Sequence, residues 1–191
     1  MSVRYVQLGD IAEFIVGVPT KPSGFNGPPN VVTVRSLTGH DINPDELDAI
    51  EFKGRDVARF QIEPGDVLLS SRSTSVKAGI VRPELAGKII NSTVNAIRLK
   101  LELHPRLLVA WIYSDEGREA LESSAQSGTA IKSVTAGALK KLSVPVIPLA
   151  EQHTLVALLE AADEVYANGI QSANNRLHVA NAAVVQKLKG Q

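Results

Sequence analysis

The sequence predicts an α+β protein, with a globular mixed α/β domain over residues 1–148 followed by a long helix over residues 149–191. Two observations predict this division. The chain holds no proline after Pro148, and apolar residues recur there every three or four positions, which is typical of an amphipathic helix. The part before Pro148 instead alternates short β-rich runs with turns rich in glycine, proline and serine, which is typical of strands joined by loops.

Ten apolar or near-apolar residues of the predicted C-terminal helix share one stripe. Its ten members lie on one face because of their spacing: Leu155, Leu159, Ala162, Tyr166, Ile170, Ala173, Leu177, Ala180, Val184 and Leu188. Their nine steps cover 33 residues, a mean of 3.67, which is nearer to a straight or slightly right-handed rod than to the 3.5 of a left-handed coiled coil. A helix of about 40 residues is roughly 60 Å long, so one small domain cannot cover it. We interpret the stripe as a surface for dimerisation or docking.

The globular part shows several strand and turn patterns. Val31 to Arg35 is β-rich, and the turn at Pro64-Gly65 precedes the apolar run from Val67 to Ser70. A strand with one buried face is predicted by the alternation of Ile97, Leu99, Leu101 and Leu103 with polar residues.

Two helices are expected before the C-terminal one. Pro105 stands at a favoured first helical position, and the apolar spacing that follows predicts a helix ending near Ser127. A second, short helix is predicted from Thr135 to Lys141, with Thr135 as its N-cap.

Composition restricts the class of protein. Cysteine is absent from the 191 residues, which excludes disulfides and thiolate zinc sites and fits a cytoplasmic protein. No apolar run is long enough for a membrane span, and no signal peptide pattern is present. The net charge is zero, whereas many nucleic-acid binders are basic, so any affinity for nucleic acid has to come from local clusters or from a partner.

Catalytic and metal-binding patterns are missing from the sequence. The four histidines have no metal-ligand spacing, and neither a phosphate-binding glycine-rich loop nor a nucleophile elbow occurs. Asp66 and Glu63 are neighbouring carboxylates, for which a surface or capping role is the better interpretation. We therefore expect a non-catalytic chain without a metal or cofactor of its own.

Three loops are rich in the donors that suit phosphates and base edges. One follows the strand at Ser70, one follows the strand at Arg35, and one follows the predicted helix near Ser127. With Lys21 from the proline-rich loop, the candidate binding residues are Lys21, Arg35, Ser36, Ser71, Arg72, Ser73, Thr74, Ser75, Lys77, Ser127, Gly128, Thr129 and Lys132. Each loop alone is more often a solvated turn, and the scarcity of aromatic residues argues against single-strand binding.

Several ordered pieces of the chain resemble the DNA-specificity (S) subunits of type I restriction–modification systems. Gln7 to Ala12 resembles the start of a target recognition domain, and Pro64 to Arg72 resembles the Pro-Gly-Asp-hydrophobic-Ser-Arg core. The most specific piece runs from Ser127-Gly128 through a Val-Pro strand to Pro148-Leu149-Ala150-Glu151-Gln152. In place of the Thr-Gly usual after the Ser-Arg, this chain has Ser73-Thr74-Ser75.

The resemblance implies a half-length subunit, because full S subunits have two recognition domains and two long helices. It implies that the globular domain reads half of a bipartite double-stranded DNA target, and that the helix pairs antiparallel with the helix of an identical chain. A modification subunit would supply methyl transfer with S-adenosylmethionine, and a restriction subunit would use ATP and Mg²⁺.

Two other functions stay open at the level of sequence. A scaffold or oligomerisation protein that docks partners through its helix and binds no DNA explains the stripe and the neutral charge equally well. An enzyme whose site matches no known motif is a more remote alternative.

Overall fold

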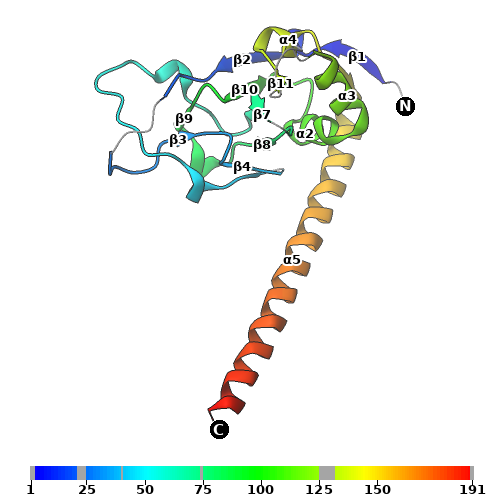
Figure 1. The fold of residues 1–191 in the computed structure, drawn as a ribbon. Helices are drawn as coiled ribbons and strands as arrows, with labels where there is room; N and C mark the ends of the chain where they lie inside the picture. The colour runs from blue at the N-terminus through cyan, green and yellow to red at the C-terminus, as the bar shows by residue number, and fades with distance from the viewer. Residues whose placement is uncertain (1–2, 21–24, 40, 74, 125–131, 190–191) are drawn as a thin grey trace. The chain divides into compact units, whose positions relative to one another are not determined.

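A computed structural model of the chain describes residues 3–20, 25–39, 41–73, 75–124 and 132–189. The chain forms two compact units, Met1–Gln152 and His153–Gln191, which are described separately below. The first unit mixes strands and helices, and the second is helical from His153 to Leu188, so the predicted α+β class is confirmed (Figure 1).

A four-stranded antiparallel sheet lies at the centre of the first unit. Its strand order is β2 (Ala12–Val16), β10 (Val94–Leu99), β6 (Val67–Ser70) and β8 (Ala78–Ile80). All four residues of β6 are buried, because the sheet is covered on both faces. This explains why Val67-Leu68-Leu69 has no polar alternation.

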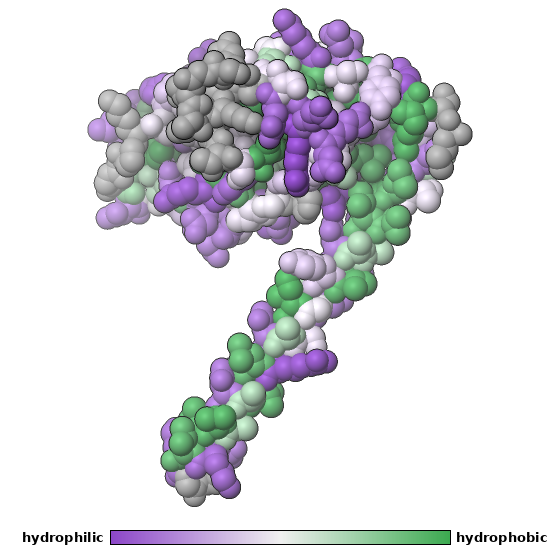
Figure 2. All heavy atoms as spheres, turned by 45° about the vertical axis from the view of Figure 1, so that its right-hand side comes forward, coloured by the Kyte–Doolittle hydropathy of each residue, from purple (hydrophilic) through white to green (hydrophobic). Residues whose placement is uncertain are grey.

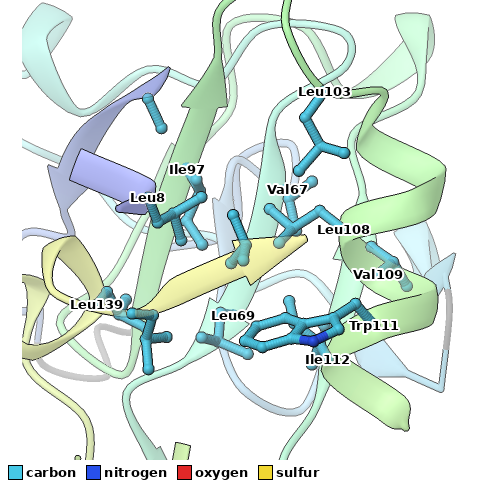
Figure 3. Packing of buried hydrophobic residues seen from close by; sticks show 14 of the residues in the cluster. Leu8, Val67, Leu69, Ile97, Leu103, Leu108, Val109, Trp111, Ile112 and Leu139 are labelled. Atoms are coloured by element: carbon cyan, nitrogen blue, oxygen red, sulfur yellow. The ribbon is translucent and has the colours of Figure 1, made fainter. Parts of the chain in front are cut away.

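Alternate residues of β6 belong to two different cores. Val67 and Leu69 pack with α2 (Pro105–Tyr113), whereas Leu68 packs on the other face of the sheet with Val32 and Ile90. Figure 3 shows Trp111 and Leu108 of α2 in the first core together with Val67 and Leu69. The inner strands are thus fixed in register by burial on both sides.

Short strand pairs surround this sheet. They are β1 (Arg4–Gln7) with β12 (Ser143–Val146), β3 (Val31–Val32) with β9 (Ile89–Ile90), β4 (Leu37–Thr38) with β5 (Asp41–Ile42), and β7 (Arg72–Ser73) with β11 (Lys132–Ser133). The β3–β9 pair is parallel and the other three are antiparallel. Short helical segments complete the unit: α1 (Leu8–Ile11), α4 (Ala136–Lys140), η1 (Pro44–Glu46), η2 (Ala58–Phe60) and η3 (Pro83–Leu85). Thr135 caps α4 as predicted, because its side chain accepts the N–H of Ala138 at 3.2 Å.

The predicted helix from Pro105 to the region of Ser127 is in fact two helices. α2 ends at Tyr113, Ser114 is extended, and α3 (Asp115–Ser124) begins at once. The Ser114 hydroxyl oxygen accepts the N–H of Gly117 at 3.1 Å, which is N-cap behaviour that the sequence analysis missed. A Cβ at Gly117 would lie 1.9 Å from the Trp111 carbonyl oxygen, so the close turn between the helices requires glycine there.

The predicted strand alternation through Leu103 is also wrong beyond Leu99. β10 ends at Leu99, and the N–H of Lys100 then donates to the Ile11 carbonyl at 2.8 Å. Leu101 is 94% exposed in the turn that follows, while Leu103 returns to the core. The predicted strand from Val31 to Arg35 is similarly shortened to Val31–Val32, after which the chain turns.

The long C-terminal helix α5 (Leu149–Leu188) is continuous over 40 residues. No helix within the described part of the chain is long and apolar enough to span a membrane. In the second unit most large residues of the predicted stripe are exposed, including Tyr166, Leu177 and Leu188, whereas Leu159 is partly buried. Apolar side chains are visible along the whole helix (Figure 2).

Candidate nucleic-acid interface

Two of the predicted donor-rich loops meet at the end of β6. There β7, which follows Ser71, pairs antiparallel with β11, with Arg72 opposite Ser133 and Ser73 opposite Lys132. The N–H of Val134 also donates to the Ser71 carbonyl at 3.0 Å. Residues 59 or more positions apart in the chain therefore form one short ribbon, which Figure 1 shows at the labels β7 and β11.

The base of the loop after β6 is closed by Ser70 and Lys77. The Ser70 N–H donates to the Lys77 carbonyl at 2.8 Å, and the Ser70 hydroxyl accepts the Lys77 N–H at 3.0 Å. Asn95 on the neighbouring strand is buried and donates from its side-chain amide to the Val134 carbonyl at 3.2 Å. The sheet thus anchors both sides of the ribbon.

The turn formed by residues 91–93, here called the 91–93 turn, connects this ribbon to the Arg35 loop. The Thr93 carbonyl accepts the Ser71 N–H at 2.8 Å, and the Thr93 hydroxyl accepts the Val34 N–H at 3.1 Å. The Ser71 hydroxyl donates to the Ser92 carbonyl at 2.9 Å. Residues from all three predicted loops are therefore joined by hydrogen bonds into one continuous region.

Arg35 is the exposed cation of its loop, with 65% of its side chain accessible. Its guanidinium forms an ion pair with Asp48, which is itself one-third exposed. Exposed pairs of this kind contribute about 0–1 kcal/mol, so the guanidinium can exchange Asp48 for another anion at small cost.

The other predicted candidates differ in where their side chains lie. Ser36 is fully buried, and its hydroxyl donates to the Glu46 carbonyl at 2.8 Å and accepts the Thr33 N–H, so Ser36 supports the loop from inside instead of presenting a surface donor. Ser71 is likewise buried, with its hydroxyl turned to Ser92. Ser75 is exposed and Lys77 is partly buried.

Arg72, Ser73 and Lys132 are placed here only by their backbone pairing in the ribbon. Lys21, Thr74, Ser127, Gly128 and Thr129 lie outside the described residues. Contact with DNA stays a prediction for the exposed members of the set. Among the described residues no group of three or more His, Asp or Glu could hold a metal ion.

Comparison with known proteins supplies the family. A family model described as the type I restriction modification DNA specificity domain matches residues 2–175. The chain belongs to this specificity-domain family. Among curated proteins, no sequence matches the chain.

Solved structures of S subunits share the fold of this specificity domain. A chain from a structure that addresses complex assembly and conformational transition of the type I R-M system has a TM-score of 0.62 at 22% identity. The HsdS subunit from Thermoanaerobacter tengcongensis has a TM-score of 0.59 at 21% identity, and the type I S subunit from M. genitalium has 0.57 at 17%. Each match covers 86% of this chain but only 39%, 38% and 40% of the other chain, respectively.

The Pro-Gly-Asp piece of the specificity domain has a structural role. Gly65 has φ +90°, and the buried Asp66 carboxylate accepts the Glu63 N–H at 2.8 Å. Arg98 of β10 donates to both Asp66 oxygens, from Nε and from one terminal nitrogen, each at 2.9 Å. The hydrogen bonds that Arg98 donates to the Asp66 carboxylate raise the pKa of Arg98 above its ordinary value. Asp66 therefore caps the turn, as predicted, but is buried instead of lying at the surface, and it ties β6 to β10.

The Glu-Gln piece at the start of α5 is explained by Gln152. This side chain is fully buried, and its amide nitrogen donates to the Glu102 carbonyl at 2.8 Å and the Ile147 carbonyl at 2.9 Å. Its oxygen accepts the His104 N–H at 2.8 Å. Gln152 thus holds the turn after β10 against the end of β12, a role that sequence reasoning did not assign.

The α5 helix of the specificity domain has apolar residues outside the predicted stripe as well. Leu158, Val165 and Val179 are 65%, 73% and 66% exposed. At about 3.6 residues per turn they form a second row roughly 100° around the helix from the stripe. These residues lie outside the stripe that the apolar spacing predicts.

Proposed function

We propose that the chain is a half-length specificity subunit that reads one half of a bipartite double-stranded DNA target and is not itself catalytic. The observation that carries the proposal is the union of the Arg35 loop, the loop after β6 and β11 in one hydrogen-bonded region. Loops with hydroxyl and guanidinium donors suit base edges and phosphates. The family membership supports the same class of function.

The second copy of the chain is proposed to bind through the stripe of α5. Exposed stripe residues such as Tyr166 and Leu177 would be buried by a matching helix. The ends of α5 also differ in charge: its acidic residues precede its basic ones, namely Glu151, Glu160, Asp163 and Glu164 before Arg176 and Lys187. An antiparallel twin places opposite charges side by side, whereas a parallel twin places like charges together.

The two-fold symmetry of the proposed dimer determines the arrangement of the half-sites in its DNA target. A two-fold dimer with identical readers recognises an inverted repeat split by unread base pairs. A spacer of roughly 60 Å is somewhat under two duplex turns of about 34 Å each, so the half-sites would lie on a similar face of the DNA.

A modification subunit with S-adenosylmethionine is proposed to supply methyl transfer, and a restriction subunit with ATP and Mg²⁺ to supply cleavage. The second apolar row, Leu158, Val165 and Val179, supports a partner besides the twin because pairing through the stripe leaves it uncovered. The zero net charge also fits a chain whose partners provide many of the phosphate contacts.

Selection from a random pool of DNA duplexes tests this function. The chain, assembled with its modification subunit, is incubated with the pool, and the bound duplexes are sequenced. We expect enrichment of a defined sequence. An equal recovery of all sequences would favour the scaffold alternative, in which α5 docks partners and the globular unit binds no DNA.

Arg35 offers a direct test of the interface within that selection. Arg35→Ala is expected to weaken binding or relax the preference by about 5- to 150-fold if the side chain reads a base. Arg82→Ala is the matched control, because Arg82 is also an exposed, ion-paired arginine but lies beside the Asp66 end of β6. Equal effects of the two substitutions would contradict the placement of the interface.

A further inference from the structure

The 91–93 turn lies between the two loops assigned to DNA reading, although none of its residues stood among the predicted contacts. It touches the Arg35 loop through the Thr93 hydroxyl, which accepts the Val34 N–H at 3.1 Å. It touches the loop after β6 through the Thr93 carbonyl, which accepts the Ser71 N–H at 2.8 Å. A single residue thus holds both loops.

The 91–93 turn is itself fixed by its own bonds. The Asn91 side-chain oxygen accepts the Thr93 N–H at 3.0 Å and the Thr93 hydroxyl at 2.5 Å. The Asn91 N–H donates to the Val32 carbonyl at 3.0 Å, and the Ser92 N–H donates to the Val18 carbonyl at 2.9 Å. A short polar turn with this many fixed bonds presents its side chains in one geometry.

Close packing against Gly17 also restrains the conformation of the 91–93 turn. A Cβ on Gly17 would lie 2.0 Å from the Asn91 carbonyl oxygen, so the backbone of Gly17 packs directly against the turn. The chain on either side of Asn91 therefore has little room to shift.

Ser92 is the exposed residue at the centre of this turn. Its backbone is engaged at both polar atoms, since its N–H bonds Val18 and its carbonyl accepts the Ser71 hydroxyl at 2.9 Å. Its side chain is exposed, and the next residue, Thr93, bonds to both reading loops. A hydroxyl on a fixed backbone can donate to or accept from a base edge.

We propose that the 91–93 turn is a third specificity element, which rests on the proposed DNA-reading function. Thr93 is a positioning residue that sets the separation between the Arg35 loop and the loop after β6. Ser92 supplies a direct hydroxyl contact to the DNA in the space between them.

The test measures sequence preference by methylation of a random duplex library with the reconstituted complex of the chain and its modification subunit. Thr93→Val keeps the branched shape but removes the acceptor for Val34, whereas Thr93→Ser keeps the hydroxyl. We expect Thr93→Val to reduce discrimination at one or more base positions by about tenfold and Thr93→Ser to restore it. Ser92→Ala should reduce discrimination at a single position by about 5- to 150-fold.

Matched controls separate a reading role from a general structural one. Thr38→Val and Ser123→Ala make the same changes at exposed residues of β4 and α3 and should leave the preference unchanged. Ser92→Ala changes an exposed side chain, so it keeps the test decisive even if Thr93→Val unfolds. The proposal is overturned if a wild-type complex with a clear target keeps that target in Ser92→Ala, or if folded Thr93→Val loses activity equally on all sequences. A wild-type complex without any preference would instead overturn the proposed function itself, and this inference with it.

Discussion

At the scale of single residues, the sequence pieces shared with S subunits are explained by buried polar contacts. Asp66 and Gln152 are 1% and 0% exposed, yet each satisfies several hydrogen-bonding groups of the main chain or of an arginine. Buried polar groups are costly unless they are paired, so such residues tolerate few replacements.

Replacing Asp66 should destabilise the globular unit more than replacing the nearby Glu63 does. Asp66→Ala leaves the Glu63 N–H without its acceptor and Arg98 without its bidentate partner. Because Arg98 is 29% exposed and keeps an ion pair to Glu63, we expect a loss of about 2–4 kcal/mol, below the full cost of an isolated buried charge. Urea unfolding followed by the fluorescence of Trp111, the one tryptophan of the chain, measures it. Glu63→Gln, at a 65% exposed carboxylate, should change the free energy by less than about 1 kcal/mol.

Replacing Gln152 tests the explanation of the Glu-Gln piece. Gln152→Leu matches the volume but removes the hydrogen bonds of Gln152 to the His104 N–H and to the Glu102 and Ile147 carbonyls, for an expected loss of about 2–4 kcal/mol in the same unfolding assay. Gln171→Leu makes the same change at an exposed position of α5 and serves as the control. Similar stabilities for the two variants would show that the Gln152 contacts contribute little.

At the scale of elements, α5 is the feature on which the proposed dimer depends. Leu159→Asp combined with Leu177→Asp puts two charges into the proposed helix pair and should produce monomers with a folded globular unit. Sedimentation gives the oligomeric state, and Trp111 fluorescence reports the globular unit. Gln171→Asp with His178→Asp adds acidic groups on the polar face and should leave the dimer intact. A dimer that survives the leucine substitutions would refute pairing through the stripe.

The elements also show what sequence patterns can and cannot predict. The apolar period of α5 and the Thr135 cap are local signals, and both elements formed where they were predicted. The break at Ser114 was missed because the apolar spacing continues across it, whereas a local cap and a close contact at Gly117 decide the outcome. Leu101 was assigned to a buried face although the chain leaves the sheet at Lys100, through a bond to a residue distant in sequence.

In the candidate interface, too, some features follow from local sequence patterns and others depend on tertiary contacts. Loops rich in donors were identifiable from composition, but the sequence could not show that Ser36 and Ser71 face inward. Nor could it show that the 91–93 turn joins the loops, because Thr93 contacts Val34 across 59 positions of the chain. Tertiary contacts of this kind leave no local pattern.

At the scale of the whole molecule, the proposed function requires two copies of the chain to act as one reader. One globular unit offers one recognition region, and the chain spans about two-fifths of the S-subunit chains that share its fold. Pairing of two chains would restore two readers with a helical spacer between them. The symmetry of the target is therefore the property that distinguishes this arrangement from a single reader.

The most direct test is the motif methylated by the reconstituted complex on long random DNA, read by sequencing that detects methylated bases. We expect two identical half-sites in inverted orientation, separated by base pairs of no fixed sequence. A contiguous or asymmetric motif, or methylation without sequence preference, would contradict it.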